Sequence, residues 1–267
     1  MYNRFELGLR YINYFFSSSS GKGHGIHSPF VFDFIDKVLN VERPDKSFFK
    51  DIEEIRQRYE HQHATIIEVE DLGAGSFTHA GRKRTVSQIV RGAAKNPKLA
   101  RLLYRIVRHY KIDSILELGT SLGLTTRYLS RANPTKGVQT IEGATGIANF
   151  TEAALINEGI ENVDIHVGDF IKKLPFALSR MEGRKLVFFD GNHQYAATIQ
   201  YFQEVLNSIG EEDVLVFDDI HWSRGMEKAW QEIKKNERVA CSIDLFFIGI
   251  VFFRKEFKEK LDFTIRF

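Results

Sequence analysis

The stretch KIDSILELGTSLGLTTRYLS, residues 111–130, decides the fold. Its apolar run up to Glu117 is typical of a buried parallel strand, and Gly119 and Gly123 follow as a loop that leads into a helix. The segment GVQTIEG then predicts a second strand ending in an acid, Glu142, which comes 25 positions after Glu117. Glycines let a ligand approach the backbone closely, and a carboxylate at the next strand end accepts hydrogen bonds from ribose hydroxyls. The spacing therefore predicts a nucleoside-binding unit.

A second glycine motif, EDLGAGS at residues 70–76, competes for this role. A short strand is predicted before it, but the residues that follow are basic and helical. They offer no acid about 20 positions on that would hold a ribose. We therefore predict a turn that leads to a helix near Thr85. The basic run Arg82, Lys83 and Arg84 is predicted to be a solvated face, with the mouth of a site as the alternative.

After Glu142 the chain continues to alternate helices and strands. Strands that alternate with helices form right-handed crossovers, so the pattern predicts a parallel α/β sheet covered on both faces. Ligands of such sheets bind at the carboxyl ends of the strands, and each predicted strand end carries an acid. The later strand ends are predicted at Gly168 and Asp169, at Asp190, and at Asp218 and Asp219.

Composition indicates a soluble globular protein, with 43% hydrophobic and 27% charged residues among 267. The 23 phenylalanines indicate large buried aromatic clusters, with an apolar pocket as the alternative. A formal charge of +2 gives no polyanion signal, so nucleic acid is not an expected partner. The single cysteine, Cys241, excludes internal disulfides and indicates a reduced thiol in a cytoplasmic protein.

The first 16 residues predict an amphipathic helix with one apolar face. Charged residues interrupt them before a signal peptide can form, and no apolar stretch approaches the roughly 20 residues of a spanning helix. We expect the apolar face to pack on the body of the protein or on a second subunit, which would make a homodimer; attachment to a membrane surface is the alternative, against which the lack of a rich cationic face argues. The face consists of Phe5, Leu9, Ile12 and Phe16.

A mainly helical extension is predicted over residues 1–94, ahead of a domain at residues 95–267. The serine- and glycine-rich segment 17–25 is typical of a flexible connection. Ser28 is placed to cap a following helix, and another helix is predicted through Ile52, Ile55 and Tyr59.

From about residue 95 to the end, the chain resembles the class I S-adenosylmethionine-dependent methyltransferases. The motifs that carry this resemblance are ELGTSLG (117–123), TIEG (140–143), GDF (168–170) and FFDGNH (188–193). The tail, with two strands predicted on either side of Leu245, resembles the hairpin that closes the sheet of that family. The resemblance implies a Rossmann-like doubly wound seven-stranded sheet with an antiparallel C-terminal hairpin. The segment HGIHSPFVFDF (24–34) also resembles the N-terminal extension of a bacterial branch.

Carried over by position, the resemblance implies a site for S-adenosylmethionine. Glu142 would accept the ribose hydroxyls, and Asp169 with Phe170 would flank the adenine; solvent-exposed loop acids are the alternative for both carboxylates. Gly143, Gly168 and Asp190 complete the implied cofactor-binding set. The residues implied around the methionine part are Glu117, Gly119, Thr120, Ser121 and Gly123. A dinucleotide oxidoreductase would share half of this pattern, but its G-x-G-x-x-G loop suits a pyrophosphate, whereas this G-x-x-x-G loop suits an amino-acid tail.

Three strand-end aspartates predict a site for a hard cation such as Mg²⁺, because adjacent strands lie about 4.8 Å apart. They are Asp190, Asp218 and Asp219. The pattern resembles the cation-dependent small-molecule O-methyltransferases. Catechol-type members have Asp-Asn after the fifth strand and a lysine where this chain has His193, so the chain is closer to the sugar and macrolide branch. The two consecutive aspartates have an alternative role, which is to cap a helix near Ser223.

The expected function is therefore methylation of a hydroxyl on a small molecule. His193 is the candidate base that takes the proton of the acceptor, His221 is the second candidate, and a structural loop histidine is the alternative. A methyltransferase for nucleic acid or protein is the second hypothesis, although DGNH (190–193) stands where the amino-methylating tetrapeptide would be. A non-catalytic cofactor-binding module is the third. The sequence leaves open the acceptor, the need for metal, the oligomeric state and the role of the extension.

Overall fold

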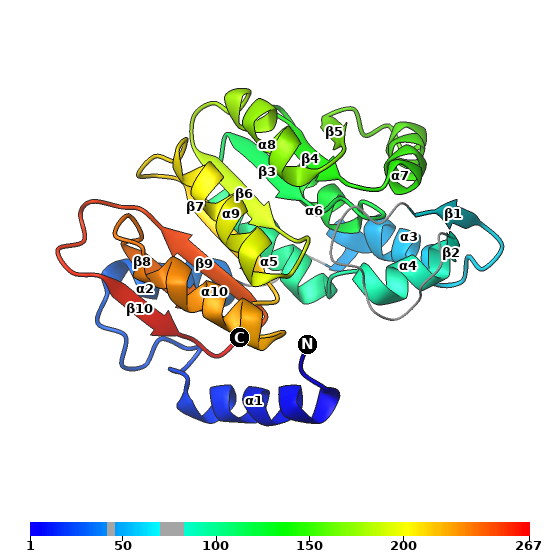
Figure 1. Cartoon of the computed structure of the whole chain (residues 1–267). Helices are drawn as coiled ribbons and strands as arrows, with labels where there is room; N and C mark the ends of the chain where they lie inside the picture. The colour runs from blue at the N-terminus through cyan, green and yellow to red at the C-terminus, as the bar shows by residue number, and fades with distance from the viewer. Residues whose placement is uncertain (42–45, 70–82) are drawn as a thin grey trace. The chain divides into compact units, whose positions relative to one another are not determined.

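The computed structural model describes residues 1–41, 46–69 and 83–267 (Figure 1). The chain divides into two compact units, of which one is Arg43–Gly183 and the other combines Met1–Glu42 with Arg184–Phe267. The predicted extension, residues 1–94, is therefore shared between the two units. The domain boundary at residue 94 stays a prediction.

The unit Arg43–Gly183 is built around three parallel strands in the order β3-β4-β5, drawn in green in Figure 1. Each strand is followed by a helix, as the alternating pattern predicts. The strands are β3 (Ser114–Leu118), β4 (Val138–Glu142) and β5 (Val163–Val167), and the helices that follow them are α6 (Leu124–Ala132), α7 (Thr145–Asn157) and α8 (Phe170–Ser179). Ahead of them lie the 3₁₀ turn η2 (Lys46–Phe49) and the helices α3 (Lys50–Glu60), α4 (Val86–Ala93) and α5 (Pro97–His109).

A separate two-stranded antiparallel sheet precedes α4 in the same unit. Its strands are β1 (Ile66–Glu68) and β2 (Lys83–Thr85). The strand before the EDLGAGS motif thus pairs with the chain just after it and does not open a parallel βαβ unit. The helix predicted near Thr85 is confirmed, because the Thr85 side chain caps α4 through the backbone N–H of Gln88. Residues 70–76 and Arg82 lie outside the described residues.

The second unit carries five strands in the order β10-β8-β9-β7-β6. Two neighbouring pairs, β6 with β7 and β10 with β8, are parallel, whereas β9 runs antiparallel to both β7 and β8. The strands are β6 (Lys185–Phe189), β7 (Val214–Asp218), β8 (Cys241–Asp244), β9 (Ile248–Phe252) and β10 (Leu261–Thr264). The helices are α1 (Arg4–Ser17), α2 (Pro29–Phe34), the π-helical turn η1 (Ile35–Leu39), α9 (Tyr195–Leu206) and α10 (Arg224–Lys235).

The predicted fold class is confirmed: the strands form a mostly parallel Rossmann-like arrangement that alternates with helices and ends in the antiparallel hairpin β8–β9. The predicted turn around Leu245 joins the two hairpin strands. Within the described ranges the strands of this arrangement number eight rather than the predicted seven, because β10 pairs with β8 at the edge of its unit. We did not predict β10, which is only four residues long, although LDFTIRF at residues 261–267 alternates apolar and polar residues as a half-buried strand does.

Helix α1 forms where the apolar spacing predicts it, and Asn3 caps it in a capping box with Glu6. Tyr14 is buried and donates a hydrogen bond to the carbonyl of Ile265, and Tyr11 packs edge-on against Phe246. The predicted apolar face does not pack on the body, because its side chains are between 52% and 79% exposed. A second subunit is the alternative that stays open for this face. None of the described helices is long and apolar enough to cross a membrane.

Candidate active site

The loop between β3 and α6 has a backbone that requires its glycines. Gly119 and Gly123 have φ of 111° and 68°, and Ser121 between them is left-handed as well, at 47°. A Cβ on Gly123 would lie 2.6 Å from Cγ2 of Thr151, so neither the conformation nor the space admits a side chain. The glycine loop of the sequence thus forms a tight strand-to-helix turn in the unit Arg43–Gly183.

Hydrogen bonds join this loop to the neighbouring strand β4 and to the helix α7. The N–H of Gly119 donates to the carbonyl of Ile141 on β4 at 2.9 Å. The N–H of Ser121 donates to the Glu142 carboxylate at 2.8 Å, and the Thr151 hydroxyl donates to the Ser121 carbonyl at 2.7 Å. The loop is therefore formed in advance of any ligand, which lowers the entropic cost of binding one.

Glu142 ends β4, as predicted, and its two carboxylate oxygens receive different backbone N–H groups. One oxygen accepts from Ser121, and the other accepts from Ala144 at 2.9 Å. Burial raises the pKa of Glu142, and these backbone hydrogen bonds oppose that rise. Each carboxylate oxygen has a second lone pair, so the group retains acceptor capacity for a pair of ribose hydroxyls.

Glu117, which the resemblance implies near the methionine part of the cofactor, is fully buried beneath the loop. One carboxylate oxygen accepts hydrogen bonds from the hydroxyls of Thr126 at 2.6 Å and Thr140 at 2.8 Å. The other oxygen, Oε1, has no hydrogen-bond partner. Burial is the largest cause that raises the pKa of Glu117, to about 7. Thr120 lies in the same network, with its hydroxyl 2.7 Å from that of Thr140.

The strand end of β5 carries the residues implied around the adenine. Gly168 has φ of 137° and donates its N–H to the Glu142 carbonyl at 2.8 Å. Asp169 caps α8, because its side chain accepts from the N–H of Lys172 at 3.3 Å, and Phe170 begins the helix. Asp169 and Phe170 are half-buried, as is Gly143 after β4. Capping explains an acid at position 169 by local structure alone, and its role toward adenine stays a prediction.

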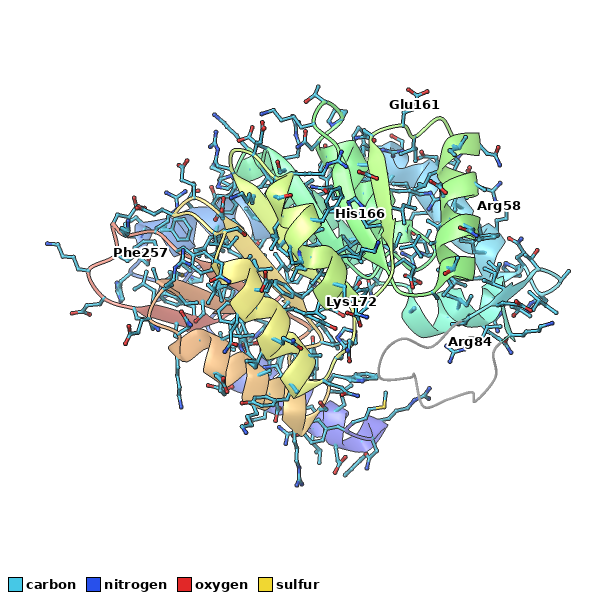
Figure 2. The ribbon with its side chains drawn as sticks, turned by 45° about the horizontal axis from the view of Figure 1, so that its top comes forward. Arg58, Arg84, Glu161, His166, Lys172 and Phe257 are labelled. Atoms are coloured by element: carbon cyan, nitrogen blue, oxygen red, sulfur yellow. The ribbon has the colours of Figure 1, made fainter. Side chains whose placement is uncertain are left out.

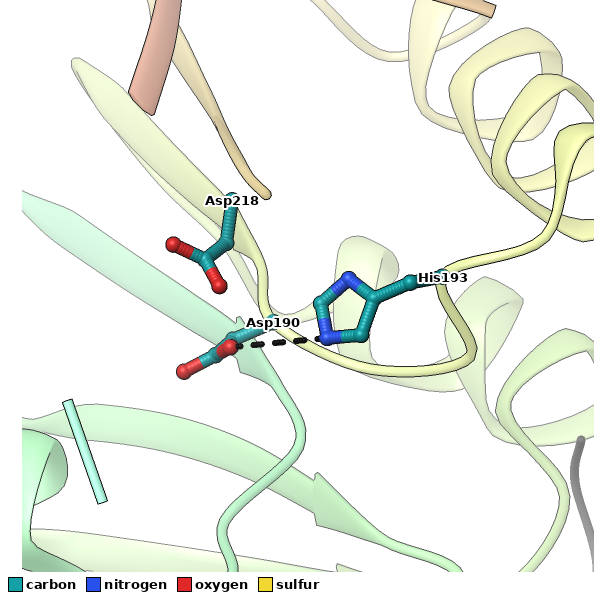
Figure 3. A group of neighbouring side chains, drawn as sticks. All are labelled: Asp190, His193 and Asp218. Atoms are coloured by element: carbon teal, nitrogen blue, oxygen red, sulfur yellow. Dashed lines mark ion pairs between the residues drawn. The ribbon is translucent and has the colours of Figure 1, made fainter. Parts of the chain in front are cut away.

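The second unit gathers two of the three predicted metal ligands with the predicted base. Donor atoms of Asp190, His193 and Asp218 all lie within 4.8 Å of one another (Figure 3). Asp190 follows β6, buried Asp218 ends β7, and His193 points toward Asp190, with Nε2 at 4.0 Å from its carboxylate. Asp219 is not part of this three-residue group, but its Oδ2 also lies 4.0 Å from Nε2 of His193.

These donors fit a divalent cation. Two carboxylates and an imidazole from adjacent strand ends are within reach of one ion after small side-chain shifts. The two loops that carry them contain left-handed non-glycine residues, Asn192 at φ of 51° and Asp219 at 53°. The alternative role of the aspartates as a helix cap is not what the structure shows, because the side chain of Ser223 caps α10.

His221, the second candidate base, is engaged at both ring nitrogens. Its Nε2 lies 2.8 Å from Asp244 and its Nδ1 lies 3.2 Å from Glu227. Burial would lower the pKa of His221, but the hydrogen bonds and charges of Asp244 and Glu227 outweigh it and raise the pKa. A protonated imidazole with two acceptors has no lone pair to receive a proton, so this arrangement favours His193 over His221 as the base.

The sequence analysis did not identify Arg127, Thr126, Thr140 and Thr151, which fasten the loop and its acids. Threonine is common on helices and strands, and although Thr140 begins the TIEG motif, nothing in the motif indicates that its hydroxyl binds Glu117. Arg127 does have a signal, because it lies four residues after Gly123 at the start of a predicted helix. That spacing places its side chain on the same face as the end of the loop.

Comparisons with known proteins agree with this geometry. The family described as "Methyltransferase domain" matches residues 116–220. No curated protein matches the sequence. Among solved structures, the chain is similar to an O-methyltransferase from Bacillus cereus in complex with SAH, at 16% identity and TM-score 0.55, covering 81% of this chain and 96% of that one.

Two further structures share the fold. The O-methyltransferase TomG from Streptomyces achromogenes, in complex with SAM, is 21% identical with TM-score 0.52, over 61% of this chain and 82% of its own. The SAH-bound methyltransferase PaMTH1 from Podospora anserina is 14% identical with TM-score 0.53, over 61% and 81%. At these identities the likeness shows the fold alone.

Proposed function

We propose that the chain is a class I S-adenosylmethionine-dependent methyltransferase that transfers the methyl group to a hydroxyl oxygen of a small molecule. The observation that carries the proposal is the left-handed loop Gly119–Gly123, bound to the strand-end acid Glu142. The loop provides close backbone approach without a phosphate cradle, which suits an amino-acid tail. Glu142 would accept the ribose hydroxyls, and Asp169 with Phe170 would border the adenine.

The residues proposed to act on the methyl acceptor lie in the unit that contains Arg184–Phe267. Asp190 and Asp218 would hold a divalent cation such as Mg²⁺, with Asp219 as a further ligand. A bound cation would lower the pKa of an acceptor hydroxyl. In the proposal His193 takes the proton released from that hydroxyl, since its Nε2 faces the two carboxylates of Asp190 and Asp219. The O-methyltransferases among the structural neighbours support a hydroxyl acceptor.

Calorimetric titration tests the donor. We expect S-adenosylmethionine and S-adenosylhomocysteine to bind, and NAD not to bind, with and without Mg²⁺. Binding of NAD together with no detectable binding of either sulfur compound would overturn the proposal. A screen of sugar, phenolic and lipid precursors with labelled methyl donor then tests the acceptor, and label recovered only in nucleic acid or protein would replace the small-molecule assignment.

The proposal places the enzyme in the cytoplasm as a homodimer. Cys241 is a buried free thiol, and burial raises its pKa to about 12, so it has little thiolate to oxidise.

The exposed apolar face of α1 supports the dimer, because four large apolar side chains on one helix face are typical of an interaction surface. Fractionation of cells and light scattering of the purified protein check the two statements.

A further inference from the structure

Arg127 lies beneath the end of the glycine loop, and each N–H of its guanidinium has an acceptor. Nη1 donates to the carbonyl oxygens of Leu122 at 3.0 Å and Gly123 at 2.8 Å. Nε and Nη2 donate to the two carboxylate oxygens of Glu158, at 2.7 Å each. The remaining N–H of Nη2 faces the hydroxyl of Tyr59 at 3.4 Å, a long hydrogen bond. Five donors thus meet five acceptors within one unit.

The position demands an arginine. The residue is 2% exposed, and a buried charge is tolerated only when it is paired and hydrogen-bonded, as the bidentate contact with Glu158 ensures. The planar fork lets one side chain bind a carboxylate on one edge and two backbone carbonyls on the other. A lysine ammonium has three donors on a single atom and does not span these acceptors.

The carbonyls of Leu122 and Gly123 belong to the part of the loop where the chain turns into α6. Leu122 is buried, so without Arg127 its carbonyl would lose a hydrogen bond in a place that water reaches poorly. The other side of the loop is held by Glu142 and Thr151 through Ser121. Arg127 is therefore the contact that fixes the C-terminal half of the loop.

We propose that Arg127, oriented by Glu158 and Tyr59, is a positioning residue that keeps the Gly119–Gly123 loop in its cofactor-binding conformation. The inference rests on the proposed function, because it assumes that this loop receives the amino-acid end of the cofactor. It also gives α3 a role. Tyr59 lies on that helix, within the predicted extension, and is buried with Leu122 and Leu124 in one apolar cluster. The second part of the extension thus supports the cofactor loop from behind.

The chain offers a matched control on the same helix. Arg131, one turn after Arg127, pairs with Asp51 and donates to the carbonyl of Phe48, and none of its hydrogen bonds reaches the loop. The test measures the affinity for S-adenosylhomocysteine by calorimetry, well below the unfolding temperature of each variant. Arg127→Lys should weaken binding about tenfold, Glu158→Gln about threefold, and Arg131→Lys less than about twofold.

A second readout separates positioning from general stability. Amide hydrogen exchange of Leu122 and Gly123 should be faster in Arg127→Lys and Glu158→Gln than in wild type, and unchanged in Arg131→Lys. If Arg127→Lys does not fold, Glu158→Gln decides, because the amide has the same shape, still offers one oxygen to the guanidinium of Arg127, and lies where the chain reaches the surface. Wild-type affinity in that variant, or in a folded Arg127→Lys, overturns the inference. If the wild-type protein itself fails to bind S-adenosylhomocysteine, the proposed function fails instead.

Discussion

At the scale of single residues, Glu117 makes the stability of the protein depend on pH. Its folded pKa of about 7 lies above the ordinary 4.5, so the folded state binds the proton more tightly than the unfolded state. The stabilisation that protonated Glu117 gives to the folded state is fully present below about pH 4.5 and is lost as the pH rises through about 7. At 1.36 kcal/mol per pKa unit, the loss is about 3 kcal/mol.

Glu117→Gln removes this dependence, because an amide does not ionise. We expect the variant to gain most of those 3 kcal/mol relative to wild type between about pH 5 and about pH 8, as measured by urea unfolding at both pH values. The exposed Glu161 (Figure 2) provides the control, since Glu161→Gln should leave the difference between the two pH values unchanged. Parallel pH curves for wild type and Glu117→Gln would contradict the assignment of this linkage to Glu117.

The metal assignment also belongs to single residues. Asp218→Asn should abolish measurable binding of Mn²⁺, followed by electron paramagnetic resonance, because buried Asp218 supplies a central carboxylate of the group. Affinity for S-adenosylhomocysteine should stay near the wild-type value. Asp219→Asn should reduce Mn²⁺ binding by less, since Asp219 lies outside the three-residue group. Equal Mn²⁺ affinity in Asp218→Asn and wild type would reject Asp218 as a ligand.

At the scale of elements, the glycine loop combines a left-handed backbone with tight packing, and two glycines of the same unit separate these effects. Gly123 and Gly159 have nearly equal φ, 68° and 70°, but a Cβ meets Thr151 at Gly123 and open space at Gly159. Gly159→Ala should cost about 1–2 kcal/mol of unfolding free energy through the backbone alone. Gly123→Ala should cost about 1–3 kcal/mol more, because the clash adds to it.

Only Gly123→Ala should also lower the affinity for S-adenosylhomocysteine, because a Cβ added at Gly159, after α7, meets no atom within 4 Å and displaces none of its neighbours. Urea unfolding and calorimetry measure the two quantities on the same variants. Equal losses of stability in both variants would show that the packing against Thr151 has no energetic weight.

The elements near the site were predictable because each has a strong local signal. Short, largely buried strands that end in an acid mark β4 (VQTIE) and β7 (VLVFD), and the observed ends at Glu142 and Asp218 agree with the prediction. The arrangement of side chains was less predictable. Glu117 is buried beneath the loop, and Asp219, which has a left-handed backbone, lies near His193 but outside the group of three donors. Such backbone choices have no periodic signal in a single sequence.

At the scale of the whole molecule, the helices of the extension could be predicted from the sequence, but their tertiary partners could not. Its helices were predictable from apolar spacing and from caps such as Ser28 and Thr85. Its division between two compact units was not, because tertiary partners are set by contacts far apart in the chain. Tyr59 illustrates the point: its spacing indicates a buried face, but nothing local indicates that the face meets Arg127, 68 residues on.

The exposed apolar face of α1 leads us to predict the oligomeric state of the protein. Phe5, Leu9, Ile12 and Phe16 are exposed in one chain, and their spacing of four, three and four residues forms a single stripe along the helix. Packing this stripe against a second copy of the chain would remove its apolar surface from water, which favours association. We therefore expect light scattering to detect a dimer, and the double variant Leu9→Ser with Ile12→Ser to be a monomer.

The double variant should unfold at about the temperature of the dissociated wild-type chain, because both side chains are more than half exposed within one chain. Tyr14→Phe is the control for α1 as a structural element. It removes the hydrogen bond to Ile265 on the buried side of the helix and should lower stability while leaving the dimer intact. A wild-type protein that is monomeric at all measurable concentrations would contradict self-association through this face, since the stripe would then remain in water in the free protein.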